Sequence, residues 1–424
     1  MTVSGRATTT TVNARHAMGL PVWSTADTPS KMRLLRGACC AGVLVFAIGA
    51  SFGFAQQAAQ FRAARQHAEQ SVRIATLRTE LVKADAIATN SFLVGGLEAP
   101  GTRATYDTAI AAATRLVASA AANDASDARV LGDINNELAA YVDAMESART
   151  NNRQGFPVGI SYLKDGSGQL RSSVLPKLQK LADANASRLQ AAYSSAAKAH
   201  TIAALCTVAA GVPLAFTIVW LAKTTRRTVN ISYFGAAGLV VIGGLVGIIG
   251  TQRAQHDANT AHDTTYAATL TLVQARSNAF DAKSAESLTL ISRGTGDAYQ
   301  NAFNKLAADA AVQLRGVADR DVGAAAFDAF MIAHANIHRL DIDGNWDGAV
   351  ALATSNDRES SNGVFAKFAN ANASAIDNVG ASFRSTLNDA YSAARSLAAL
   401  TVLAGLMAFG LCLVAMTPRL REYQ

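Results

Sequence analysis

Four uninterrupted apolar segments divide the chain and alternate with long polar stretches. They cover residues 37–54, 201–221, 233–250 and 397–416, and none of them contains Asp, Glu, Lys, Arg or His. Each is about 18–21 residues long, which is enough for a helix to cross the hydrocarbon core of a bilayer. The pattern therefore predicts four transmembrane helices with the lipid bilayer as their environment.

The two long polar segments predict helical bundles. They are rich in Ala and poor in Pro, and residues 251–396 contain no proline at all, a composition that favours helix. Leu77, Leu81, Ala84, Ala88 and Phe92 recur at three- and four-residue steps, which gives one helix an apolar stripe that must be buried. Breaks at Gly, Pro, Asn and Asp clusters predict four helices in each segment, at 56–94, 102–121, 127–150 and 170–199, and at 254–292, 298–317, 324–340 and 349–396. The expected fold is an all-α membrane protein with four transmembrane helices and two tandem extracytoplasmic four-helix bundles.

Charge sets the expected orientation. The short pieces flanking the apolar segments carry 10 basic and two acidic residues, whereas the long segments are nearly balanced, with 16 basic and 13 acidic in the first and 12 basic and 16 acidic in the second. An excess of basic residues is typical of cytoplasmic flanks. Both bundles are therefore expected on the extracytoplasmic side of the cell membrane and both termini on its cytoplasmic side. The sequence pI near 9.3 then reflects topology, and no nucleic-acid partner is expected.

This orientation defines the expected domains. Small residues at Gly53 and Ala55 also suit a signal-peptide cleavage site, but the first apolar run is longer than a signal h-region, so we expect it to be retained. The domains are a cytoplasmic tail at 1–36, a transmembrane helix at 37–54, bundle 1 at 55–200, a second transmembrane helix at 201–221, a cytoplasmic loop at 222–232, a third transmembrane helix at 233–250, bundle 2 at 251–396, a fourth transmembrane helix at 397–416 and a cytoplasmic tail at 417–424.

The second half repeats the first at low identity. Arg78 corresponds to Arg276 and Tyr141 to Phe330, and the breaks fall at matching places. Repeated layout at a fixed period is typical of duplication. The opposite charge balance of the two bundles favours their pairing.

Two groups of residues in the bundles are candidates for binding. Large apolar residues in the loop between the third and fourth helices predict either a protein-docking patch or a cap on the bundle core, and they are Phe156, Pro157, Ile160, Tyr162 and, in the second repeat, Trp346. Arginines on the first helices either receive a ligand carboxylate or form solvated faces, and they are Arg65, Arg73, Arg78 and Arg276. In the third apolar segment, Gly243 and Gly247 form a GxxxG pair that favours close packing of transmembrane helices.

Catalysis and metal binding are not expected. His334, His338 and Asp341 share a helical face but lack a third histidine and an intervening Glu, so we interpret them as a solvated helix end. The acidic segment that begins at Asp341 has neither the Gly at position 6 nor the Glu at position 12 that an EF-hand loop requires. No nucleophile elbow, phosphate loop or paired Cys ligands occur. We therefore predict no enzyme activity, no catalytic residues, no cofactor and no metal site.

Each half resembles the four-helix-bundle sensor domain of bacterial chemoreceptors and sensor kinases, with two copies fused in one chain. The whole layout, with its short central loop and the ending Pro418-Arg-Leu-Arg-Glu-Tyr423, is similar to the GlnX family of actinobacterial membrane proteins. That resemblance implies two partners: an extracytoplasmic amino-acid-binding lipoprotein of the GlnH type, and a cytosolic Ser/Thr kinase of the protein kinase G type.

Three functions remain open. The leading hypothesis is a transmembrane signal transducer that relays an amino-acid signal from the lipoprotein to the kinase. The second is a stand-alone receptor that binds a small ligand directly between its bundles. The third is a non-signalling structural protein of the cell envelope.

Overall fold

The computed structural model describes residues 28–96, 98, 100–225, 230–317, 322–415 and 417. Within these ranges every element is helical and no strand occurs, which confirms the all-α prediction. The helices are α1 (Thr28–Val45), the π-helix η1 (Phe46–Ala50), α2 (Ser51–Val94), α3 (Pro100–Asn123), α4 (Ala128–Arg153), α5 (Val158–Gln169), the π-helix η2 (Leu170–Val174), α6 (Leu175–Thr225), α7 (Ile231–Ala261), the π-helix η3 (His262–Tyr266), α8 (Ala267–Ile291), α9 (Asp297–Gly316), α10 (Ala324–Ile342), α11 (Trp346–Thr354) and α12 (Ser361–Ala415).

The chain separates into two compact units. The membrane unit comprises the described parts of Met1–Phe54, Thr201–Ile249 and Ser396–Gln424, and the bundle unit comprises the described parts of Ala55–His200 and Gly250–Arg395. Four continuous helical segments are long and apolar enough to cross a membrane, namely Ser30–Val94, Val158–Thr224, Ile231–Ile291 and Ser361–Ala415. Each of these segments supplies residues to both units. The covalent connections between the units are therefore helical backbone.

The membrane unit has an apolar interior and an apolar exterior. Phe46, Val43, Leu214 and Val240 are buried against one another in one cluster. Large apolar side chains on the opposite faces are exposed, including Ile48 at 69%. A soluble protein rarely exposes so many large apolar side chains in one region, so this exterior suits contact with lipid.

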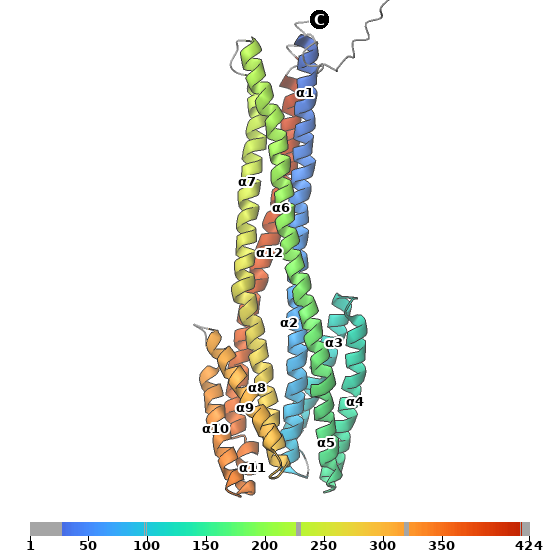
Figure 1. Ribbon diagram of the computed structural model, residues 1–424, viewed down its shortest axis with the longest axis vertical. Helices are drawn as coiled ribbons and strands as arrows, with labels where there is room; N and C mark the ends of the chain where they lie inside the picture. The colour runs from blue at the N-terminus through green and yellow to red at the C-terminus, as the bar shows by residue number, and fades with distance from the viewer. Residues whose placement is uncertain are drawn as a thin grey trace, which may run out of the picture. The chain divides into compact units, whose positions relative to one another are not determined.

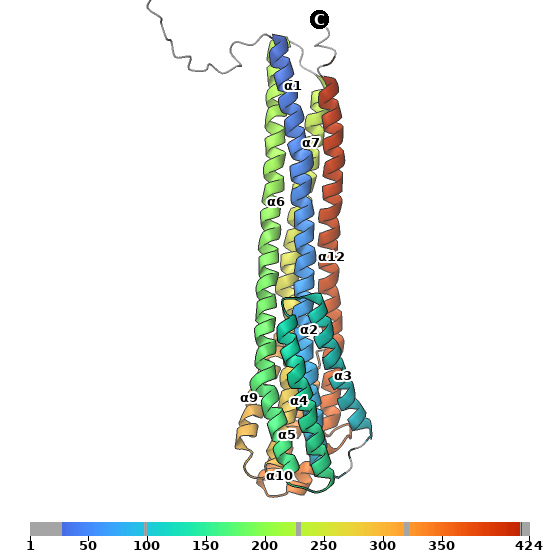
Figure 2. The same ribbon diagram turned by 90° about the vertical axis from the view of Figure 1, so that its right-hand side faces the viewer.

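The bundle unit contains two groups of helices. In the first, α3, α4 and the continuous run of α5, η2 and α6 accompany α2 (Figure 1). In the second, α9, α10 and α12 accompany α8, and the short α11 lies between α10 and α12. Figure 2 shows α3 and α4 running alongside α2. Both groups bury their apolar stripes in one shared cluster.

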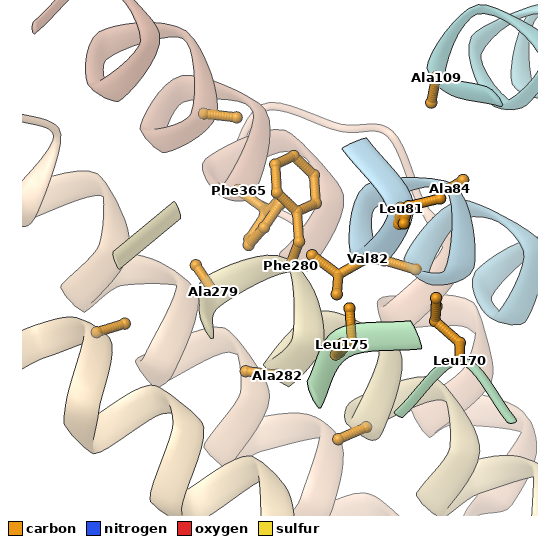
Figure 3. Close-up of a cluster of buried hydrophobic side chains, with 14 of the residues drawn as sticks. Leu81, Val82, Ala84, Ala109, Leu170, Leu175, Ala279, Phe280, Ala282 and Phe365 are labelled. Atoms are coloured by element: carbon orange, nitrogen blue, oxygen red, sulfur yellow. The ribbon is translucent and has the colours of Figure 1, made fainter. Parts of the chain in front are cut away.

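The predicted stripe on α2 forms part of this core. Leu77, Leu81, Ala84 and Ala88 are at most 5% exposed, whereas Phe92 is only partly buried. Figure 3 shows side chains of α2, η2, α6 and α8 meeting in this cluster, among them Leu81, Val82, Leu170, Leu175 and Phe280. At about 25 cal/mol per Å² of apolar surface removed from water, this shared core is the main stabilising contribution to the pairing of the two groups.

The helices α2 and α8 pack against each other in parallel. Thr79 Oγ1 lies 3.4 Å from the Val273 carbonyl oxygen, and Ser284 Oγ donates a hydrogen bond to Asp85 Oδ2 at 2.7 Å. The partners in these two pairs are 194 and 199 residues apart. The contacting positions advance together along both helices, which defines the parallel direction.

Two predicted helix boundaries are wrong. The loop expected across residues 151–168 is confined to Gln154–Pro157, and α5 begins at Val158. Gly155 does lie in the turn, with φ of +73°, but two other glycines of the predicted break are sites of close packing: a Cβ on Gly159 would lie 2.9 Å from the Ala148 carbonyl oxygen, and one on Gly166 would lie 2.6 Å from Met145 Cε. A glycine inside a helical pattern often has such a packing role.

The second wrong boundary lies in the last expected helix, at 349–396. It is interrupted between α11 and α12, where Ser355 and Ser360 form hydrogen bonds with Asp357. Ser and Asp side chains that bond nearby backbone groups compete with helix in this way.

Candidate functional site

A cavity of about 430 Å³ lies between α2, α8 and α12 in the bundle unit. Two of the four predicted arginines, Arg73 and Arg276, line it together with Arg384. Its other lining residues are Ala68, Glu69, Val72, Thr76, Thr79, Glu80, Leu116, Tyr266, Thr269, Val273, Ala373, Ile376, Asp377, Gly380 and Phe383. The walls thus combine apolar surface with side chains of both charges.

Arg276 is the most confined cation of this cavity. Burial lowers the pKa of its guanidinium, and the nearby carboxylates of Glu80 and Asp377 oppose that effect. The Arg276 guanidinium lies 5.2 Å from the centre of the Phe280 ring, and Nη1 donates a hydrogen bond to the Ala369 carbonyl. Arg73 donates to Gln70 Oε1 at 2.6 Å. Since Arg binds carboxylates well and Glu80 and Asp377 can receive an ammonium, the cavity suits a small zwitterion.

The other two predicted arginines lie elsewhere. Arg65 pairs with Glu69 at 2.9 Å and also contacts Asn388, with more than a third of its side chain exposed. Arg78 is largely buried and donates to Ser277 Oγ at 3.2 Å. It lines a separate cavity of about 220 Å³ between α2, α6 and α8. The structure therefore brings together Arg73 and Arg276 only.

A buried charge cluster joins the two helix groups, and sequence reasoning missed it. Asp85 on α2 is fully buried and accepts hydrogen bonds from Ser167 Oγ at 2.5 Å, Arg171 Nη2 at 2.9 Å and Ser284 Oγ at 2.7 Å. Arg171 also pairs with Asp281 of α8. Burial alone would lower the pKa of the Arg171 guanidinium, but Asp85 and Asp281 outweigh burial and raise it. Arg171 is therefore held as a cation between the two groups.

The backbone around Arg171 departs from the regular α-helix. Arg171 belongs to the π-helix η2, which links α5 to α6. A π-turn is rare and often occurs at a functional site. The partners of Arg171, which are Asp85 and Asp281, lie 86 and 110 residues away in the chain. No local sequence motif therefore indicated the cluster. In the sequence alone, Asp85, Arg171 and Asp281 resemble charged residues on a solvated helix surface.

A second buried cluster lies inside the second group. Glu286 of α8 pairs with Lys283 Nζ at 2.6 Å and with His334 Nδ1 at 2.9 Å, and it accepts from Ser361 Oγ at 3.0 Å. Burial opposes ionisation of Glu286, but Lys283 and His334 outweigh it and lower its pKa to about 2. The interpretation of His334 as part of a solvated helix end is wrong, because its ring is buried and stacks on Phe303 with 3.3 Å between centroids.

No metal centre is formed in the part of the chain that the structure describes. No group of three potential ligands drawn from His, Cys, Asp and Glu is close enough to hold an ion there.

The predicted docking residues have two different environments. Phe156, Pro157 and Tyr162 lie exposed at the turn from α4 into α5, with Phe156 at 54% and Tyr162 at 42% exposure. Ile160 is partly buried against the core. Trp346 begins α11 and is also partly buried: its Nε1 donates to the Leu290 carbonyl at 2.9 Å, and Arg293 stacks on its ring. Trp346 thus closes the end of α8, while the first three residues form an exposed apolar patch.

The predicted glycine pair lies in the membrane unit. A Cβ added to Gly247 would lie 2.6 Å from the Phe54 ring, whereas one on Gly243 would make an ordinary 3.5 Å contact with Ala404. Gly247 is therefore the position at which a larger side chain would meet its neighbour. The terminal motif at 418–423 and most of the tail at 1–36 lie outside the described residues.

Comparison with known proteins identifies one part of the chain. Residues 60–194 match the family model of the actinobacterial sensor domain. This match covers α2 from residue 60, all of α3, α4 and α5, and α6 as far as residue 194. Comparisons with curated proteins and with solved structures gave no match. The match and the four apolar helices support a sensor protein of the membrane.

Proposed function

We propose that this protein is a transmembrane signal transducer. It senses an extracytoplasmic nutrient, an amino acid, through a GlnH-like binding lipoprotein and relays the signal to a cytosolic Ser/Thr kinase of the protein kinase G type. The observation that carries the proposal is that a sensor-domain match lies on helices that are continuous with apolar spans. A displacement of such a helix can pass along its axis without crossing a loop.

The input surface in this proposal is the exposed patch of Phe156, Pro157 and Tyr162. Large apolar residues at an exposed turn are typical of protein docking. The lipoprotein itself is suggested by the resemblance to the GlnX family. The patch sits at the start of the same helical run that carries Arg171, so docking at the patch acts on the helix that holds the buried charge cluster.

The output surface in this proposal is cytoplasmic. It comprises residues 1–36, 222–232 and 417–424, which are short and rich in Arg and Lys. In this proposal they form the surface to which the cytosolic kinase binds.

Crosslinking in membranes tests the relay. The full chain with a photo-crosslinker at residue 162 is expected to capture an extracytoplasmic binding protein, and one with the crosslinker at residue 223 is expected to capture a kinase. Phe156→Asp should abolish the first capture and leave the second. Val312→Asp is the matched control, because Val312 is a comparably exposed apolar residue on α9. Capture of neither partner by the unsubstituted protein would refute the proposal.

The cavity at Arg73 and Arg276 favours a second candidate, direct binding of a small ligand between the bundles. Its mixture of arginines and carboxylates suits an amino acid. Calorimetry on the full chain in nanodiscs, with L-aspartate and L-glutamine as probes and no lipoprotein present, separates the two candidates. Binding that Arg73→Gln weakens and Arg129→Gln does not would favour the receptor. Arg129 is an exposed arginine on α4 outside this cavity.

A further inference from the structure

A second, smaller cavity lies inside the first helix group, near the end of α2 and the end of α4. Its volume is about 130 Å³, and it shares no lining residue with the cavity at Arg73 and Arg276. Its polar lining comes from Ser91, Glu98, Arg103, Arg149, Asn152 and Arg153. Phe92, Met145 and Leu163 supply apolar wall. The cavity thus concentrates cationic donors beside one carboxylate.

Arg149 has hydrogen-bonding capacity that the protein does not use. Its side chain is only 11% exposed, and Nη1 donates to Glu146 Oε1 at 2.8 Å. Its Nη2 is buried and has no hydrogen-bond partner, and its buried Nε has only the ion-pair contact with Glu98 at 3.3 Å. The guanidinium is held in place by stacking on the Tyr106 ring at 3.8 Å. Buried donors without partners are costly and rare in folded proteins, so the unpartnered Nη2 points to a ligand acceptor.

Glu98 presents the complementary charge. Its Oε2 lies 3.3 Å from Arg149 Nε, while its Oε1 is buried and has no hydrogen-bond partner. Arg103 is already paired, with Asp107 and Glu146. The groups left without a partner are therefore Nη2 of Arg149 and Oε1 of Glu98, with the exposed Arg153 at the rim.

We propose that this cavity is a binding site for a small α-amino acid. The ligand carboxylate would accept from Arg149 and Arg153, since Arg binds carboxylates in a fork geometry. The ligand ammonium would donate to Glu98. At about 30 Å³ for each water in the liquid, the cavity of about 130 Å³ holds about four waters, whose combined volume matches a small amino acid. Phe92, Met145 and Leu163 leave room for a short apolar side chain.

This inference goes beyond the proposed relay, because it places a ligand directly in the first bundle. The cavity is walled by the ends of α2 and α4 and by α5. The same α4–α5 turn carries the exposed patch of Phe156, Pro157 and Tyr162. A ligand here would therefore stiffen the helices next to the proposed docking surface.

Calorimetry on the full chain in nanodiscs tests the site with two matched probes. L-alanine carries both charged groups, and propionate is the same molecule without the ammonium. L-alanine is expected to bind, and propionate to bind at least tenfold more weakly. Glu98→Gln should weaken L-alanine at least tenfold but should not weaken propionate, because it removes a carboxylate that pairs with Arg149. Failure of L-alanine to bind the unsubstituted protein at about 10 mM, well above a millimolar Kd, would overturn the proposal.

Three arginine variants complete the test. Arg149→Gln and Arg153→Gln should each weaken L-alanine at least tenfold, and circular dichroism checks that helix content is kept. Because Arg153 is exposed, its variant remains informative even if Arg149→Gln unfolds. Arg129→Gln, on the same helix but outside the cavity, should bind as the unsubstituted protein does. Unchanged binding by Arg153→Gln, or equal loss by Arg129→Gln, would contradict the proposal. Crosslinking at the Phe156 patch is a separate readout, so failure of this site and failure of the relay are distinguishable.

Discussion

Arg171→Met tests whether the buried charge cluster holds the two helix groups together. The substitution keeps the length and apolar stem of the side chain but removes its charge. Asp85 then retains its donors from Ser167 and Ser284 but loses its cationic partner, and Asp281 loses its ion pair. Asp85 is fully buried and the Asp281 side chain is 9% exposed. Neither carboxylate can turn to bulk water without opening the packed interface.

The magnitude follows from that burial. Removing one partner of a buried ion pair costs about 3–5 kcal/mol, since an uncompensated charge remains inside. The free energy of unfolding of the bundle unit should fall by that amount. Lys177→Met is the matched control, because Lys177 of α6 pairs with Glu137 while about a third of its side chain is exposed. A pair as exposed as this contributes less than about 1 kcal/mol.

Denaturant titration of the full chain in detergent, followed by circular dichroism at 222 nm, measures both changes. Asp85→Asn in the Arg171→Met background should recover part of the loss, because Asn carries no charge: its carbonyl oxygen can accept from one serine, and its NH2 can donate to the hydroxyl of the other. The resulting double-mutant cycle isolates the coupling between Asp85 and Arg171. If Arg171→Met costs no more than Lys177→Met, the cluster does not contribute to pairing and the reasoning fails.

Three further predictions concern other parts of the chain. Glu286 has its pKa lowered to about 2, so its stabilisation should be complete above about pH 4.5 and lost as the pH falls towards 2; unfolding titrations from pH 2 to 6 should show this dependence, and Glu286→Gln should weaken it, since the lowered pKa values of Asp124, Glu137 and Glu146 leave a remainder. Gly247→Leu should destabilise the membrane unit by about 1–3 kcal/mol through overpacking against Phe54, whereas Gly238→Ala, which meets no atom within 4 Å, should melt within a degree or two of the unsubstituted protein. Asn345→Ala removes the N-cap of α11, whose side chain accepts from a backbone N–H at 3.0 Å, and should cost about 1 kcal/mol in thermal unfolding.

The features that sequence predicted correctly depend on local pattern. Apolar runs without charged residues predicted the four helices that are long and apolar enough to cross a membrane. The stripe from Leu77 to Ala88 predicted the buried face of α2. Both signals are periodic within one helix, so they need no knowledge of neighbouring elements.

The features that sequence missed depend on contacts between distant elements. Every residue from Ala279 to Ile291 of α8 is buried, including Asp281, Lys283 and Glu286. A helix surrounded on all sides has no polar face, so its charges look like a solvated surface when the sequence is read alone. The π-helix η2 positions Arg171, and no residue pattern in the sequence predicted this π-helix. For the same reason, Arg73 and Arg276 meet in one cavity while Arg65 and Arg78 do not.

The position of α8 suggests how the two charge clusters would act in the proposed relay. Asp281 and Ser284 on α8 contact the Asp85 and Arg171 cluster, while Lys283 and Glu286 on the same turns contact His334 and Ser361. Sliding or rotating α8 would therefore strain bonds to both helix groups at once. Buried polar contacts of this kind have few acceptable geometries, because a partly satisfied cluster costs more than an apolar one. Such an element is suited to two discrete positions and not to continuous drift, which is what a relay along the helical segment Ile231–Ile291 requires.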